Sequence, residues 1–246
     1  MPATVAVPLA AVPLFLVILA AWADAVVPHW TRACLVDRLG FGNGTRPPSL
    51  IPVVGDTHIV LACHVVAALL LGAARLARRV SIPDICRLYL WGSASFLMCN
   101  VLKEALADND CNRHSNSVSG HFNYFLYLLL AARFLTEPGM GMHSRTAMSK
   151  LVDGLRAALL VPVILTLYTT YAGGYHSLRQ CVYGAAFGLF NFSIFSAAVR
   201  DRRMGDFHGL SYCLAAVGSS LYAARVQPAP LDYAIMIGGN AIAFLN

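Results

Sequence analysis

The sequence is poor in charged residues, which make up 12% of its 246 residues, about half the share typical of soluble domains. Hydrophobic residues reach 58%, and the mean hydropathy is +0.62. This composition excludes an ordinary soluble domain and indicates a polytopic membrane protein. The net charge of +6 comes from short basic clusters between apolar runs, so we expect no nucleic-acid partner.

The chain also lacks a CxxC pair, a repeat of fixed period and a soluble domain. Its seven cysteines are scattered, and His114 and His121 have no third ligand nearby, so we expect neither a metal site nor a cofactor. The absence of a repeat disfavours a transporter. We expect one helical transmembrane domain over residues 1–246, with a core at about 57–200 and an apolar C-terminal extension at about 207–246.

Long apolar runs are what the sequence has instead, and most are close to the ~20 residues that cross ~30 Å of hydrocarbon. We predict an all-α membrane protein with six transmembrane helices and one or two further apolar helices. The fourth run is short unless its helix begins near Ser117. The expected spans are 5–27, 58–77, 85–106, 122–135, 151–171 and 182–199, and the two weaker candidates are 210–226 and 231–245.

Basic residues flank the second, fourth and sixth connections between these runs, whereas the third carries Asp108 and Asp110. By the positive-inside rule the even-numbered connections are cytosolic, and the odd-numbered ones lie on the lumenal side. The sequon that begins at Asn43 falls in the first lumenal connection and agrees with this orientation. Cys34 and Cys111 also fall on this side, where a disulfide could form if the compartment is oxidising.

Two histidines stand at run boundaries on this expected lumenal side. His121 follows Ser119-Gly120 at the start of the fourth run, where Ser117 or Ser119 could cap a helix. The exposed N–H groups of such a helix start favour an anion. His176 follows a glycine pair, and Gln180, four residues later, could hydrogen-bond its ring and fix its tautomer. We expect the two histidines to face each other.

Each of these features also has an ordinary structural explanation. A histidine at a membrane boundary is more often a satisfied polar residue than a catalyst, and Ser-Gly at a helix start is common capping. Gly184 and Gly188 are more often a helix packing face than part of a site. The hypothesis of a site therefore depends on the joint pattern of two histidines, an anion-favouring helix start and an orienting amide.

At these residues the chain resembles a known superfamily. Val118-Ser119-Gly120-His121 is similar to the second motif of the lipid phosphate phosphatases, and the stretch from His176 to Gln180, followed by Gly184, is similar to the third. The closer resemblance is to the fat-storage-inducing transmembrane (FIT) proteins, an endoplasmic reticulum branch with six spans and a lumen-facing site. In them, as here, an aliphatic residue precedes Ser-Gly-His, and a glutamine stands four residues after the second histidine. The resemblance covers roughly residues 112–135 and 169–195.

The resemblance implies a lipid-phosphatase-like helical bundle that hydrolyses a phosphoanhydride or phosphoester of a lipid-like substrate, acyl-CoA in the FIT branch. It implies that His176 is the nucleophile and that His121 is the acid and base. Ser119 and the Gly120 N–H would hold the phosphate, and Gln180 would orient His176.

The sequence departs from the phosphatase pattern in its cations. The first motif has only the imperfect echo of Arg38 and Arg46-Pro47, and Thr170 stands where an arginine precedes the second histidine by six residues. Because phosphoryl transfer depends on charge stabilisation, other cations would have to bind the substrate. The candidates are Lys103, Arg113 and Arg179.

Three functions stay open. The first is a FIT-like diphosphatase of the endoplasmic reticulum, which acts on acyl-CoA or a membrane lipid and affects lipid droplets. The missing cations and the extra apolar segments instead favour a catalytically degenerate structural subunit of a larger membrane complex, with partners at the C-terminal helices and the mitochondrial inner membrane as its location. A polyprenyl or sphingoid phosphate phosphatase would share the same two histidines.

Overall fold

The computed structural model describes residues 6–27, 34, 56–106, 111, 117–137 and 146–200. Within these ranges all regular structure is helical, which confirms the all-α prediction for this part of the chain. Arg113, His114, the sequon at Asn43 and the C-terminal extension at 207–246 lie outside the described residues. The helices are α1 (Ala6–Val26), α4 (Asp56–Leu76), α5 (Ile82–Leu106), α6 (Gly120–Leu135), α7 (Ala147–Ala158), α8 (Leu160–Ala172) and α9 (Leu178–Arg200).

The helices coincide with the expected runs except at two places. The run expected at 151–171 is two helices, α7 and α8, which meet at Leu159. Pro162 explains this break, because a proline lacks the N–H that would continue the α-helical ladder and its ring clashes with the carbonyl four residues earlier. The fourth run begins at Gly120 rather than near Ser117, so α6 has only 16 residues and is about 24 Å long.

Three of the described helices are long and apolar enough to cross a membrane: His58–Leu76, Ala147–Ala172 and Leu178–Arg200. Pro13–Val26 is a shorter apolar helix. Several large apolar side chains on α1 are exposed, among them Leu14, Phe15 and Trp22 at 62% each, as expected of a helix that faces lipid. The chain therefore has the helices of an integral membrane protein, and the count of six spans stays a prediction.

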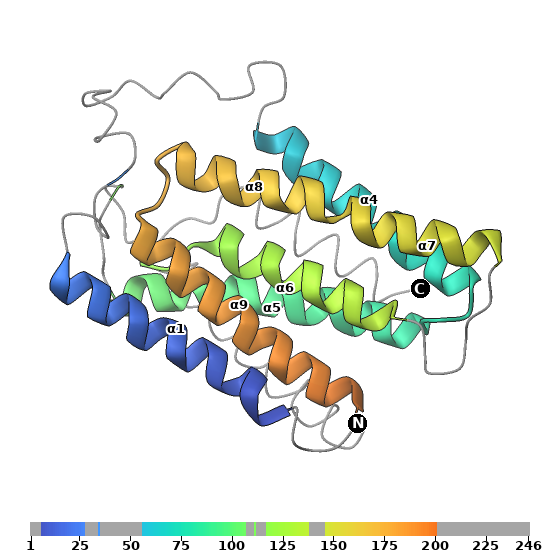
Figure 1. The fold of residues 1–246 in the computed structure, drawn as a ribbon, viewed down its shortest axis with the longest axis horizontal. Coiled ribbons are helices and arrows are strands. Elements are labelled where there is room, and N and C mark those ends of the chain that lie inside the picture. Colours follow the sequence, from blue (N-terminus) through green and yellow to red (C-terminus); the bar gives the residue numbers. More distant parts are fainter. Residues whose placement is uncertain are drawn as a thin grey trace.

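Helix α6 lies at the centre of the bundle. It packs most extensively on α9 and also contacts α5, α8 and α4, while α1 packs along α9 (Figure 1). On the opposite edge of the molecule α4 lies against α7 and α8 (Figure 1). This central helix carries the Ser-Gly-His motif at its start, where Ser119 and Gly120 are buried and His121 is exposed.

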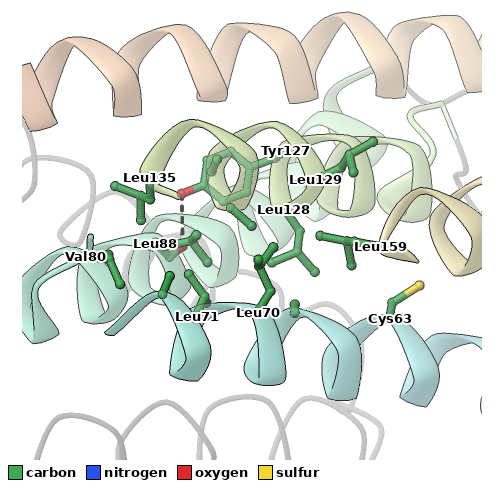
Figure 2. Packing of buried hydrophobic residues seen from close by; sticks show 14 of the residues in the cluster. Cys63, Leu70, Leu71, Val80, Leu88, Tyr127, Leu128, Leu129, Leu135 and Leu159 are labelled. Atoms are coloured by element: carbon green, nitrogen blue, oxygen red, sulfur yellow. Dashed lines mark hydrogen bonds between the residues drawn. The ribbon is translucent and has the colours of Figure 1, made fainter. Parts of the chain in front are cut away.

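The apolar core lies between α4, α5 and α6. Leu70 and Leu71 of α4 meet Leu88 of α5 and Leu128 of α6, and all four are almost fully buried (Figure 2). The hydroxyl of Tyr127 donates a hydrogen bond to the Leu88 carbonyl at 2.9 Å (Figure 2). This bond satisfies the polar tip of an otherwise apolar side chain, as is usual for buried tyrosine.

Contacts between connections show which helix ends lie together. At one end, Arg79 of the α4–α5 turn hydrogen-bonds Ser149 of α7 and the Thr136 carbonyl after α6. At the other end, Ser117 before α6 donates to the Lys103 carbonyl of α5. The connections before and after α6 thus lie at opposite ends, as the alternation of the predicted spans requires.

A disulfide joins Cys34 to Cys111, with their Cα atoms 5.4 Å apart. Cys34 and Cys111, which were expected on one side of the membrane, therefore lie together. We expect a maleimide to label both cysteines of the denatured protein only after reduction, with the labels located by peptide mass spectrometry. Cys86, a free cysteine, is the matched control and should be labelled in both samples. Labelling of Cys34 before reduction would contradict the disulfide.

Candidate functional site

Ser119 caps the first turn of α6. Its hydroxyl oxygen accepts from the Phe122 N–H at 3.4 Å, and the residue is fully buried. Of the two serines proposed from the sequence, Ser119 is therefore the cap. The N–H groups at a helix start, that of Gly120 among them, lie before the first carbonyl that the helix itself can offer them. They form the anion-favouring end of α6.

A second cap organises the start of α9. The Gln180 N–H donates to the Ser177 hydroxyl at 3.4 Å, and the Ser177 N–H donates to the Gln180 side-chain carbonyl oxygen, Oε1, at 3.1 Å. This reciprocal pair is a capping box. Because a backbone N–H can only donate, the atom that faces it must be the amide oxygen rather than the amide nitrogen.

This assignment of the amide fixes the tautomer of His176. The ring nitrogen Nδ1 of His176 lies 3.2 Å from the same Gln180 Oε1. An amide oxygen can only accept, so Nδ1 carries the proton and the neutral ring has its lone pair on Nε2. The hydrogen bond expected from the four-residue spacing is thus present. His176 is also buried, with 5% of its surface exposed.

The two helix starts are joined directly. The Ser119 N–H donates to the Gln180 backbone carbonyl at 3.1 Å. Close packing of α6 on α9 permits this bond, because a Cβ on Gly184 would lie only 2.5 Å from the Ser119 carbonyl oxygen. A Cβ on Gly188 would likewise lie 2.6 Å from the Asn123 carbonyl oxygen. The two glycines are therefore a packing face, and this face brings the two motifs into contact.

His121 occupies a different face of α6. Two residues of helix turn its side chain about 200° from that of Ser119, which contacts α9. Its ring is exposed and stacks on Phe125 at 6.1 Å between centroids. Phe125 in turn meets the edge of His64 on α4 at 5.7 Å. The structure brings the backbones of the two motifs together, whereas the facing of the His121 and His176 rings stays a prediction.

The cation nearest to His176 in sequence is already engaged. Arg179 donates to Asp24 of α1 at 2.9 Å, and each of the two side chains is 12% exposed. A substrate phosphate at Arg179 would compete with this partly buried carboxylate, which holds the guanidinium by a charge-assisted hydrogen bond. The pair also fixes the end of α1 to the start of α9.

Two further positions bear on the charge of the site: Thr170, where the phosphatase pattern has an arginine, and the candidate cation Lys103. Thr170 is buried and donates to the Thr166 carbonyl at 2.7 Å, so this position supplies no cation. Lys103 is partly exposed, and its backbone carbonyl accepts from the Ser117 hydroxyl at 3.2 Å. Lys103 therefore belongs to the part of α5 that adjoins the start of α6. Among the described residues no cluster of three metal-binding side chains is present.

A buried polar cluster below the site was not anticipated from the sequence. Ser95, Asn123 and Asn191 come from α5, α6 and α9, and all three are fully buried. The Ser95 hydroxyl donates to Asn123 at 2.8 Å, and the Asn191 amide donates to Ser95 at 2.6 Å. The available signal was one asparagine inside each of two apolar runs, because a polar residue at membrane depth needs a polar partner.

His64 on α4 is a further polar residue that sequence reasoning missed. Its Nδ1 donates to the Val60 carbonyl at 2.9 Å, which leaves Nε2 as the acceptor for the Tyr124 hydroxyl at 3.2 Å. The two rings also stack, with centroids 5.6 Å apart. This histidine lies within a helix that is long enough to span a membrane, so the pair links α4 to α6 inside the bundle.

An apolar groove of about 350 Å³ runs between α8 and α9, and Phe122 of α6 lines it as well. Tyr171 and Leu178 line it where α8 and α9 approach the turn that carries His176. Ala185 lines it one to two turns further along α9. Only apolar surface lines the groove.

Comparison with known proteins gives no relative. No family model matches the chain, and no curated protein or solved structure is significantly similar to it. The functional assignment therefore depends on the residues and their geometry.

Proposed function

We propose that the chain is a FIT-like membrane hydrolase, which cleaves a phosphoanhydride or phosphoester of a lipid-like substrate at the lumenal side of the endoplasmic reticulum membrane. The observation that carries this proposal is the orientation of His176. Gln180 holds the proton on Nδ1, so that Nε2 is the nucleophilic nitrogen, and the same Gln180 accepts from the first turn of α6 through its backbone. The proximity of the His176 turn to an anion-favouring helix start supports the proposal that His176 is the nucleophile.

The proposed reaction proceeds in two displacements. Nε2 of His176 attacks the phosphorus, an N–P bond forms, and the P–O bond to the leaving group breaks while His121 gives its proton to the leaving oxygen. Water then attacks the phosphorus, its proton passes to His121, and the N–P bond breaks. For this role the His121 side chain must leave its stack on Phe125 and extend over the end of α6 toward the His176 turn.

The transferred group would be held at the start of α6 by Ser119 and the Gly120 N–H. The Ser119 hydroxyl oxygen accepts from Phe122, so its own proton can be donated to a phosphate oxygen. Ser119 is fully buried, and a substrate would reach it only from the end of the helix. Lys103 is the candidate among the described cations to balance the charge of the phosphate, because its helix end adjoins this turn.

The purified chain in lipid nanodiscs tests this proposal. It should convert palmitoyl-CoA into acyl phosphopantetheine, detected by mass spectrometry, and an alkaline quench during turnover should preserve an acid-labile phosphorus adduct on the His176 peptide. Phosphatidic acid, sphingosine phosphate and polyprenyl phosphate, assayed in parallel, distinguish the diphosphatase from a lipid phosphatase. Turnover with the adduct on another residue would sink His176 as the nucleophile.

A structural subunit of a membrane complex is the second candidate. It is favoured by the Arg179–Asp24 ion pair, which occupies a cation that catalysis could use, and by the full burial of Ser119. On this reading the two caps and the glycine face only hold α6 against α9. The structural role would be established by two results together: the purified chain hydrolyses none of the four substrates, and it is recovered from native membranes in a stable assembly.

Gln180 offers a graded prediction for the enzyme. Gln180→Leu removes the acceptor of both His176 and Ser177, so we expect kcat/KM to fall about 10²-fold and the free energy of unfolding to fall by about 1–3 kcal/mol. Gln180→Glu keeps both hydrogen bonds and adds a carboxylate that favours the imidazolium. This variant should have a lower Tm than the wild type, because a carboxylate replaces an amide at a fully buried position, and its acidic loss of activity should begin at a higher pH.

The measurement is kcat/KM over a pH series together with Tm for both variants. Gln180→Asn, whose shorter side chain keeps the amide but not its reach, is the matched control and should resemble Gln180→Leu. Equal activity of the wild type and Gln180→Leu would show that the hydrogen bond to His176 serves only the helix cap.

A further inference from the structure

The groove between α8 and α9 begins at the proposed site. Leu178 lines the groove and lies two residues after His176. Cys181 also lines it, and its N–H donates to the Ser177 carbonyl at 3.1 Å. On α6, Phe122 lines the groove while its N–H bonds the Ser119 hydroxyl. One end of the groove therefore adjoins both motifs. The groove is lined by apolar side chains, whereas the motifs carry polar ones.

From that end the groove extends along α9, which is long and apolar enough to cross a membrane. The lining residues on α9 lie between Leu178 and Ala185, which are separated by seven positions, or about 10 Å of helix. One leaflet contributes about 15 Å of the ~30 Å hydrocarbon layer, so the groove spans most of one leaflet. Ile164 and Tyr168 also line it and are 58% and 53% exposed, so its side faces the surrounding lipid.

We propose that this groove binds the single acyl chain of the substrate, with the phosphate end directed to His176. The inference rests on the proposed function and adds the place where the hydrocarbon chain of the substrate binds. The volume of about 350 Å³ suits one chain. A helix about 10 Å across would occupy roughly twice this volume over the same length, so a partner helix does not fit inside the groove.

Ala185→Phe tests the groove by filling it. In the wild type, kcat/KM should be far higher for palmitoyl-CoA than for butyryl-CoA, because each buried methylene contributes about 0.8 kcal/mol. In Ala185→Phe this ratio should drop at least ~10-fold. Ala68→Phe adds the same ring at an exposed position of α4 and should leave the ratio unchanged. The proposal that the groove binds the acyl chain would be overturned by an unchanged ratio in Ala185→Phe. It would also be overturned if the wild type cleaved both substrates with equal kcat/KM.

Photocrosslinking separates this inference from the proposed function, because it needs no turnover. A palmitate carrying a terminal diazirine, supplied in phosphatidylcholine nanodiscs, should label peptides of α8 and α9 in the wild type, in His176→Ala and in Ala68→Phe, and much less in Ala185→Phe. Such labelling in a chain without hydrolase activity would support the groove and overturn the enzyme. Labels spread over the lipid-facing residues of α1 and α4 would overturn the groove, whatever the activity.

Discussion

His176→Ala is expected to lower kcat/KM for palmitoyl-CoA by at least ~10³-fold, because the substitution removes the nucleophile of the proposed first displacement. The fold should survive this change. Gln180 keeps its hydrogen bond to the Ser177 N–H, and only its bond to the imidazole is lost, at a cost of about 0.5–1.5 kcal/mol. The variant should thus lose its activity but keep most of its Tm, whereas a general loss of structure would lower both.

Two other histidines sharpen this test. His58→Ala, at an exposed position in the first turn of α4, is the matched control and should retain wild-type activity. His121→Ala removes the proposed acid and should lower kcat/KM by about 10²–10⁴-fold, with less effect on a substrate whose leaving group needs no proton. The measurement is the steady-state rate of product formation for each variant. If the kcat/KM of His176→Ala lay within ~10-fold of the wild-type value, His176 would be excluded as the nucleophile.

Local sequence was sufficient for the parts of the site that local geometry determines. The four-residue spacing of His176 and Gln180 predicted their hydrogen bond, and Ser119 was one of two serines expected to cap α6. Both features depend on one helical turn and its first N–H groups. Hydropathy likewise predicted the helices, because a helix buried in lipid must be apolar along its length.

Features that depend on how helices pack were not predictable in the same way. A glycine pair is compatible with many partners, and only the assembled bundle shows that Gly184 faces Ser119. The direction of His121, toward Phe125 and not toward α9, follows from the rotation of α6 relative to its neighbours. The same rotation aligns Asn123 with Ser95 and Asn191. The spacing of residues along α6 does not by itself specify this rotation, because it depends on the neighbouring helices.

Gly184→Ala is expected to destabilise the bundle and to reduce activity together. The added Cβ would lie 2.5 Å from the Ser119 carbonyl oxygen and 2.9 Å from the Phe122 Cβ. These are backbone and near-backbone atoms, which cannot rotate away, so α6 and α9 must separate. Overpacking of this kind costs about 1–3 kcal/mol, and the separation stretches the bond from the Ser119 N–H to the Gln180 carbonyl. The helix start would then move away from His176, which lowers kcat/KM.

Gly72→Ala is the matched control for this prediction. Gly72 lies within α4, a helix also long enough to span a membrane, and a Cβ there would meet nothing within 4 Å. The same substitution should therefore stabilise the helix by about 0.5–1 kcal/mol. The measurement is Tm by differential scanning fluorimetry in nanodiscs, with kcat/KM for both variants. A Gly184→Ala variant with the Tm and activity of Gly72→Ala would contradict the close packing of α6 on α9, and with it the contact that places the anion-favouring helix start beside His176.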